Sequence, residues 1–71
     1  MEKEPMISYD PLWKTLVDKH MNKGELCEAA HLSKGTVTKM GMGESVTLDV
    51  IARICGTLHV PIQDVVEIKK A

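Results

Sequence analysis

The sequence predicts a single all-α domain of 71 residues, and three observations support this class. Apolar residues recur at the three- and four-residue spacing of a helix, while the alternation of a half-buried strand is nearly absent. Capping residues precede several of the apolar segments, as they do at helix starts. Aromatic residues make up only 3% of the chain, so aliphatic side chains and methionine must form the core. A chain this short supports one hydrophobic core and no second domain.

The N-terminal residues lead into the first helix. Residues 1–8 show no hydrophobic period and contain Pro5, which predicts a flexible arm before a domain over residues 9–68 and a tail over residues 69–71. Asp10 then predicts an N-cap, and Pro11 suits the first helical position. The expected apolar stripe of this helix, which ends near residue 19 or 20, consists of Leu12, Trp13, Leu16 and Val17.

Three further helix starts share one design. Asn22, Ser33 and Thr47 are predicted N-caps, and each follows an apolar residue that can pack on another one five residues later. Glu25 completes a capping box with Asn22. These starts predict helices over residues 23–30, 34–40 and 48–58. The apolar face expected for the helix 48–58 consists of Leu48, Ile51, Ile54, Cys55 and Leu58.

The predicted helix ends depend on glycine and proline. Gly41 and Gly43 are expected to end the helix 34–40, because glycine tolerates the left-handed conformation of a helix exit. Pro61 is expected to begin a short last helix. The final residues either fray or pair as a short strand between two chains, and a homodimer is expected to use the apolar residues Val65, Val66 and Ile68.

The helix 34–40 has two different faces at 100° per residue. Ser33, Val37 and Met40 cluster on one side, which has just enough apolar surface to pack on the domain through Val37 and Met40. The opposite side is small, polar and cationic, and consists of Gly35, Thr38 and Lys39, with Lys34 and Thr36 flanking it. A short helix, a turn over residues 31–33 and a second helix presented outward match the helix-turn-helix, whose second helix enters the DNA major groove. Lysine and threonine suit that task because they bind base edges and phosphates.

Charge and composition bear on the function classes. The formal net charge is −1, although DNA-binding domains are usually basic. Residues 31–43, however, carry two lysines and no acid, and more distant charges are screened beyond about 10 Å. No enzyme is expected, because the histidines are dispersed and "KMGMGE" lacks the strand–loop–helix setting of a phosphate-binding loop.

The remaining expectations concern ligands and location. Cys27 and Cys55 are predicted to be buried, reduced thiols of a cytoplasmic protein. Cys27 and His31 lie four residues apart, but no second pair has ligand spacing, so no metal or cofactor is expected. No apolar run approaches ~20 residues and no signal peptide is recognisable, so no membrane association is expected. The chain has little room for a small-molecule ligand.

The region from Ile7 to Ile68 resembles the Cro/repressor-type, or xenobiotic-response-element-like, helix-turn-helix family. The similar segments are the "PLWKTL" start, the helix-turn-helix over residues 23–43 with its "KMGMGE" exit, and the short closing helix. A compact bacterial and phage subgroup shares them. The resemblance implies a five-helix domain like that of lambda repressor. It also implies a sequence-specific transcriptional repressor that binds operator DNA as a homodimer and inserts the helix Lys34–Met40 into the major groove.

The resemblance also implies which residues bind DNA. The start of the second helix contacts phosphates, the third helix contacts bases, and the following loop adds further contacts. The family usually has glycine where His31 stands. A histidine there can adopt a positive φ at some cost, so either the turn is distorted or His31 itself faces a phosphate. The DNA-binding set comprises Asn22, Lys23, Ser33, Lys34, Gly35, Thr36, Thr38, Lys39, Met42 and Ser45.

One alternative function remains open from the sequence. The helix-turn-helix fold also suits a protein-interaction module, such as an antitoxin or a phage-encoded inhibitor, that does not bind DNA. The net charge of −1, His31 and the glycine in the third helix favour it. Capture of one protein partner in stoichiometric amount, without DNA binding at low salt, would distinguish this module from a regulator.

Overall fold

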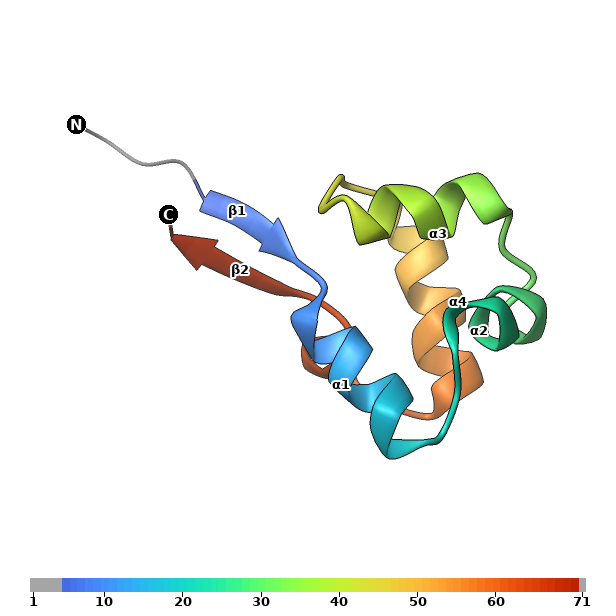
Figure 1. Cartoon of the computed structure of the whole chain (residues 1–71). Helices are drawn as coiled ribbons and strands as arrows, with labels where there is room; N and C mark the ends of the chain where they lie inside the picture. Colours follow the sequence, from blue (N-terminus) through green and yellow to red (C-terminus); the bar gives the residue numbers. More distant parts are fainter. Residues whose placement is uncertain (1–4, 71) are drawn as a thin grey trace.

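Four α-helices and a two-stranded ribbon form the part of the chain that a computed structural model describes, residues 5–70 (Figure 1). The all-α class predicted from the sequence is confirmed for the body of the domain. The predicted fifth helix is a single 3-10 turn, and the ribbon was not expected within one chain. The elements are β1 Pro5–Ser8, α1 Asp10–Asp18, α2 Lys23–Ala29, α3 Lys34–Gly41, α4 Leu48–Leu58, the turn η1 Ile62–Asp64 and β2 Glu67–Lys70.

Local capping sets the starts of α2, α3 and α4, as predicted. The side chain of Asn22 accepts a hydrogen bond from the Glu25 backbone at 2.7 Å, and the Glu25 carboxylate accepts one from the Asn22 backbone at 3.0 Å. Ser33 and Thr47 each accept a hydrogen bond at 3.2 Å from a backbone N–H three residues later. Because such bonds close within one helical turn, the sequence suffices to predict them.

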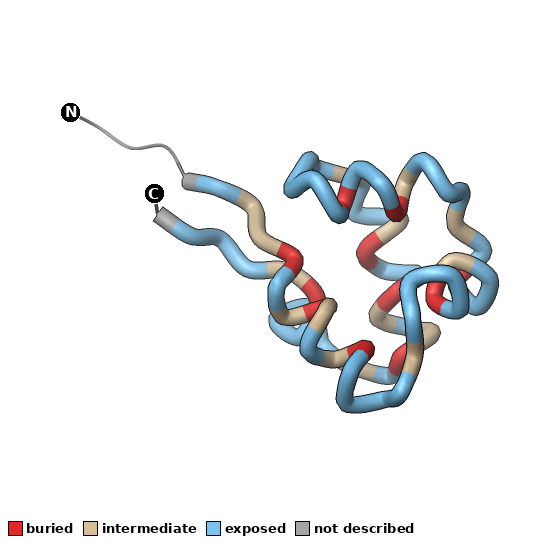
Figure 2. Tube along the Cα trace, viewed as in Figure 1, coloured by how far each residue is buried: buried red, intermediate tan, exposed pale blue. Residues whose placement is uncertain are grey.

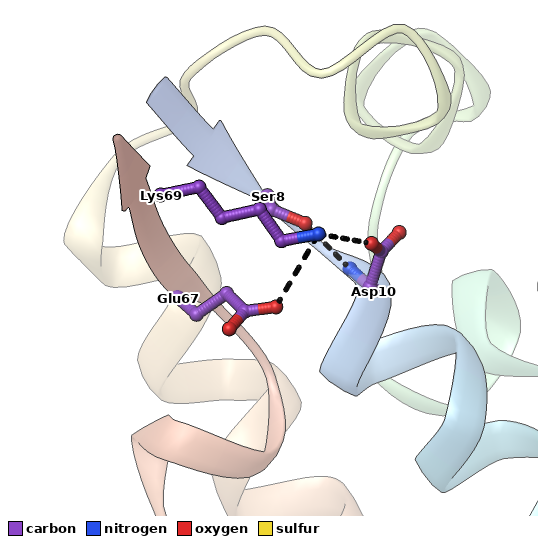
Figure 3. Close-up of polar contacts among 4 residues, drawn as sticks. All are labelled: Ser8, Asp10, Glu67 and Lys69. Atoms are coloured by element: carbon purple, nitrogen blue, oxygen red, sulfur yellow. Dashed lines mark hydrogen bonds and ion pairs between the residues drawn. The ribbon is translucent and has the colours of Figure 1, made fainter. Parts of the chain in front are cut away.

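The start of α1 differs from the prediction. Tyr9 occupies the N-cap position and Asp10 is the first helical residue. The Asp10 carboxylate accepts a hydrogen bond from Lys69 Nζ at 2.8 Å, while the Asp10 backbone N–H donates to Ser8 Oγ at 3.2 Å (Figure 3). The ion pair with a lysine 59 positions away replaces the local capping role of Asp10.

Histidine follows three of the four helices of the described chain in the left-handed conformation. His20, His31 and His59 have φ values of 58°, 56° and 58°, and Gly43 has a φ of 77° after α3. His31 therefore adopts the positive φ that the sequence indicated a histidine could adopt at this position at some cost. Each of these histidines adopts a backbone conformation that costs about 1–2 kcal/mol for a residue with a Cβ.

The core lies between the four helices (Figure 2). Two predicted core residues lie outside it, since Val17 is 71% exposed and Leu48 is 77% exposed. Both are displaced by roughly 85–120° from the centre of the buried face of their helix at 100° per residue, so each lies beyond the edge of the apolar stripe. The buried cluster consists of Tyr9, Leu12, Leu16, Leu26, Ala30, Met40, Ile51, Ile54, Leu58 and Val65.

The antiparallel ribbon joins the two ends of the described chain. Ile7 pairs with Ile68, and Ser8 pairs with Glu67. The predicted flexible arm over residues 1–8 is thus a strand over residues 5–8, whereas residues 1–4 lie outside the described residues. The predicted boundary of a tail at residue 69 falls within β2, and Ala71 lies outside the described residues. The ribbon projects from the helices in Figure 1.

The C-terminal apolar residues divide between core and surface. Val65 is fully buried in the core of its own chain and Val66 is half-buried, whereas Ile68 is 65% exposed. Of the residues expected to join two copies, Val65 is therefore unavailable. In the described part of the chain, no helix has the length and apolar character needed to cross a membrane.

Candidate nucleic-acid interface

The helix α3 presents the two faces predicted from its sequence. Val37 and Met40 are buried and attach the helix to the domain. The exposed residues of α3 are Lys34, Gly35, Thr38, Lys39 and Gly41, and Thr36 is half-buried. Within residues 5–70 neither lysine of α3 forms an ion pair. Both ammonium groups of this helix are therefore accessible to an anionic ligand.

The turn before α3 is fixed by contacts from two sides. The Leu32 N–H donates to the Cys27 carbonyl at 2.9 Å, and Cys27 Sγ donates to the Leu32 carbonyl at 2.8 Å. Arg53 of α4 donates to the His31 carbonyl at 3.5 Å and forms an ion pair with Asp49 at 3.2 Å. These contacts hold the turn against both α2 and α4, so the orientation of α3 is set by the fold.

Two of the predicted site residues contact each other at the start of α3. Ser33 Oγ lies 2.9 Å from Thr36 Oγ1 and accepts the hydrogen bond of the Thr36 backbone. Their hydroxyl groups therefore order the first turn of the helix. Lys34, Thr38 and Lys39 are exposed elsewhere along α3.

A groove between α2 and α3 brings together predicted residues from both helices. Lys23 Nζ lies 4.6 Å from the centroid of the Trp13 ring, within the range of a cation–π interaction. The same nitrogen is 3.7 Å from the position that a Cβ at Gly41 would occupy. The groove, of about 490 Å³, is lined by Lys23, Gly24, Cys27, Lys34, Val37, Thr38 and Gly41.

Helical periodicity gave Trp13 only a packing role, so the sequence did not reveal its contact with Lys23. The two residues lie on consecutive helices, and only the tertiary structure brings their side chains together. The sequence holds only a weak signal of this contact, namely an aromatic residue at the edge of an apolar stripe that is followed by a lysine at the start of the next helix. Trp13 thus holds a predicted phosphate-binding lysine at the side of the groove.

The loop after α3 is attached to the start of α1. Tyr9 is 3% exposed, and its hydroxyl donates to the Glu44 carbonyl at 2.7 Å. Burial raises the pKa of this phenol above its ordinary value. The predicted site residues Met42 and Ser45 flank that anchor and are exposed. The role of Tyr9 was not predicted, because its partner lies 35 positions away.

The structure places six of the ten predicted site residues in two depressions that flank α3. Lys23, Lys34 and Thr38 line the groove between α2 and α3. Thr36, Lys39 and Ser45 line a second depression between α3 and α4. Asn22 is exposed at the start of α2, where its side-chain oxygen is engaged in the capping box.

The described chain shows no clustered metal ligands. Within residues 5–70, no group of three or more His, Cys, Asp or Glu side chains is placed to hold a metal ion. Cys27 and Cys55 are free thiols and half-buried, less covered than predicted. Burial raises the pKa of the Cys55 thiol, which disfavours the reactive thiolate.

The fold and the outward cationic helix define a helix-turn-helix domain of the DNA-binding class. Residues 11–71 match the family model of the Cro/C1-type HTH DNA-binding domain. The chain therefore belongs to this family, which confirms the resemblance seen in the sequence.

Two solved structures are similar to this one. The transcriptional regulator VanUg is 39% identical with a TM-score of 0.91, and the match covers 100% of this chain and 93% of that chain. The prophage Lp1 protein 11 is 24% identical with a TM-score of 0.69 over 78% of this chain and 75% of that chain, which shows likeness of fold alone. No curated protein matches.

Proposed function

We propose that this protein is a sequence-specific transcriptional repressor that inserts α3 into the major groove of operator DNA. The observation that carries the proposal is the joint exposure of Lys34, Thr38 and Lys39 on a helix anchored by Val37 and Met40. An exposed helix with this chemistry suits base recognition. The similar protein VanUg is described as a transcriptional regulator, which supports a regulatory role.

The base contacts are assigned to the outward face of α3. Lys34 and Lys39 donate to guanine acceptors, and Thr38 offers a hydroxyl to bases and a methyl group to thymine. Gly35 is exposed in the first turn of α3, where the absence of a side chain lets the backbone approach the groove wall. Thr36 and Ser33 complete the base-contacting end through their paired hydroxyl groups.

The phosphate contacts are assigned to the two flanks of α3. Asn22 and Lys23 bind phosphates on one side of the groove, with the Lys23 ammonium held beside Trp13. Met42 and Ser45 contact the opposite backbone from the loop that Tyr9 attaches. We further propose that the protein acts in the cytoplasm as a homodimer, because a two-fold symmetric protein matches a near-palindromic operator.

The decisive experiment is selection of a binding site from random duplexes, followed by fluorescence anisotropy at about 50 and 200 mM salt. We expect one preferred sequence and an affinity that falls steeply with salt, because phosphate binding releases counterions. Binding that shows no salt dependence, or that selects no sequence, would contradict the proposal.

A substitution on α3 tests the assigned face. Lys39→Ala is expected to weaken binding to the selected site by about 1–3 kcal/mol and to relax its sequence preference. Lys14→Ala is the matched control, since Lys14 is exposed on α1 beside Asp18, Asp64 and Glu67. Equal affinities of the two variants would remove Lys39 from the interface.

A further inference from the structure

The ribbon has an open edge with apolar and charged side chains. Within residues 5–70, β2 pairs only with β1, so its second edge has no partner strand. Ile68 is 65% exposed on this strand, and Met6 is 56% exposed on β1. A two-stranded ribbon is marginally stable alone, and an open edge with exposed apolar residues is a template for another strand.

The sequence of β2 is complementary to itself. We infer that the open edge of β2 pairs antiparallel with β2 of a second copy of this chain, centred on Ile68. In that register Glu67 lies opposite Lys69 of the second copy, and Lys69 lies opposite Glu67 of the second copy. A two-fold interface requires such self-complementarity, and opposite charges directly across an antiparallel pair are stabilising.

The resulting four-stranded sheet would have one apolar face and one charged face. Ile68 lies opposite Ile7 within one chain, so the pairing forms a continuous isoleucine row from one copy to the other. Glu67 and Lys69 share the other face, where their side chains lie 3.9 Å apart and Lys69 also contacts Asp10 at 2.8 Å (Figure 3). The charges that meet the second copy are thus already gathered on one face.

The edge of β2 suits this pairing better than the edge of β1. The strand β1 includes Pro5, which has no N–H to donate, and proline is typical of edges that receive no further strand. The pairing nevertheless joins only four residues of each chain. Their contact area is well below the ~1,200 Å² of buried surface that a stable interface needs. We therefore expect weak association in free solution.

DNA strengthens the pairing if it holds two copies side by side. Two molecules on adjacent half-sites have a high effective concentration, which converts a weak contact into cooperative binding. This step rests on the proposed function and specifies the surface of the proposed homodimer. The strand pairing itself does not require DNA.

Disulfide trapping tests the register directly. Ile68→Cys, in a chain whose two cysteines are replaced by serine, places two thiols opposite each other at the two-fold axis. We expect disulfide-linked dimers under mild oxidation. Val17→Cys in the same background is the matched control, because Val17 is similarly exposed but lies on α1. Equal cross-linking of both variants would overturn the inference.

Charge reversal adds a test that depends on the Glu67–Lys69 pairing. Within the Ile68→Cys background, Glu67→Lys or Lys69→Glu alone puts like charges opposite each other and is expected to lower cross-linking about tenfold. An equimolar mixture of the two variants restores opposite charges and is expected to restore cross-linking as a heterodimer. A mixture no better than either variant would overturn the proposed register.

Two controls separate pairing from folding and from DNA binding. Lys69→Glu also removes the contact with Asp10, so Asp10→Asn should leave cross-linking unchanged, and circular dichroism should show an intact fold for each variant. Cross-linking is measured without DNA. Absent cross-linking with normal DNA binding therefore rejects only the strand pairing, whereas absent DNA binding with normal cross-linking rejects only the proposed function.

Discussion

The ammonium of Lys23 lies 4.6 Å from the centroid of the Trp13 ring, at the edge of the groove between α2 and α3. The contact joins α1 to the first residue of α2. Because the indole restricts the lysine side chain, less conformational entropy remains to be lost when the ammonium binds an anion. A Cβ at Gly41 would lie 3.7 Å from this ammonium nitrogen, at the distance of an ordinary contact.

Lys23→Met should separate the charge of this residue from its packing. We expect a loss of about 0.5–1 kcal/mol in the free energy of unfolding and a change in Trp13 fluorescence, because the indole loses its neighbouring cation. The salt slope of DNA binding should fall by about one if the ammonium contacts a phosphate. Lys19→Met, at an exposed position after α1, should leave the fluorescence unchanged. An unchanged salt slope would exclude the phosphate contact.

Gly35→Ala should change stability and DNA affinity in opposite directions. An added Cβ would lie 3.9 Å from Ser33 Oγ, an ordinary contact, so the folded state accommodates alanine. Helix propensity then favours the variant by up to about 1 kcal/mol in urea unfolding. Affinity for the selected duplex should fall, since the methyl group separates the backbone from the groove. Tighter or equal binding would show that α3 does not approach DNA at this residue.

Ser33→Ala and Thr47→Ala form a matched pair of cap removals. Each variant should lose about 1 kcal/mol of unfolding free energy, because a backbone N–H at the helix start loses its acceptor. Only Ser33→Ala also releases the Thr36 hydroxyl at the start of α3. DNA affinity, measured well below the unfolding midpoint of both variants, should therefore fall more for Ser33→Ala. Equal affinities would place Ser33 and Thr36 outside the DNA contact.

The contact between Asp10 and Lys69 should make the ribbon sensitive to acid. The hydrogen bond from Lys69 and its positive charge hold the pKa of the Asp10 carboxyl below its ordinary value. A lowered pKa in the folded state stabilises the protein above the unfolded-state pKa, and that contribution disappears as the pH falls through the folded-state value. Both side chains are more than half exposed, so salt should weaken the effect.

A double-mutant cycle measures this contribution. The coupling between Asp10→Asn and Lys69→Met in urea unfolding should be constant near neutral pH and should vanish as the pH falls below about 4. The hydrogen exchange of the β1 and β2 amides should accelerate over the same interval. A coupling that persists at low pH would show that the two side chains interact without the carboxylate charge.

The starts of α2, α3 and α4 and the outward face of α3 were predictable from the sequence, because these features depend on contacts within about one helical turn. The caps at Asn22, Ser33 and Thr47 close over three residues. The spacing of Val37 and Met40 likewise determines which side of α3 is buried. Most of the candidate site lies on these locally specified segments.

Only the tertiary structure decided how distant segments meet. Lys69, 59 positions away in the sequence, binds the Asp10 carboxylate, which therefore does not cap α1. The same pairing of the two chain ends makes residues 5–8 a strand. The contact between Trp13 and Lys23 exists only in the folded chain. Val17 is exposed because the buried face of α1 is narrower than its apolar stripe. Local hydrogen bonds and helical period are encoded within a few residues, whereas strand pairing and helix crossing depend on the free energy of packing the whole chain.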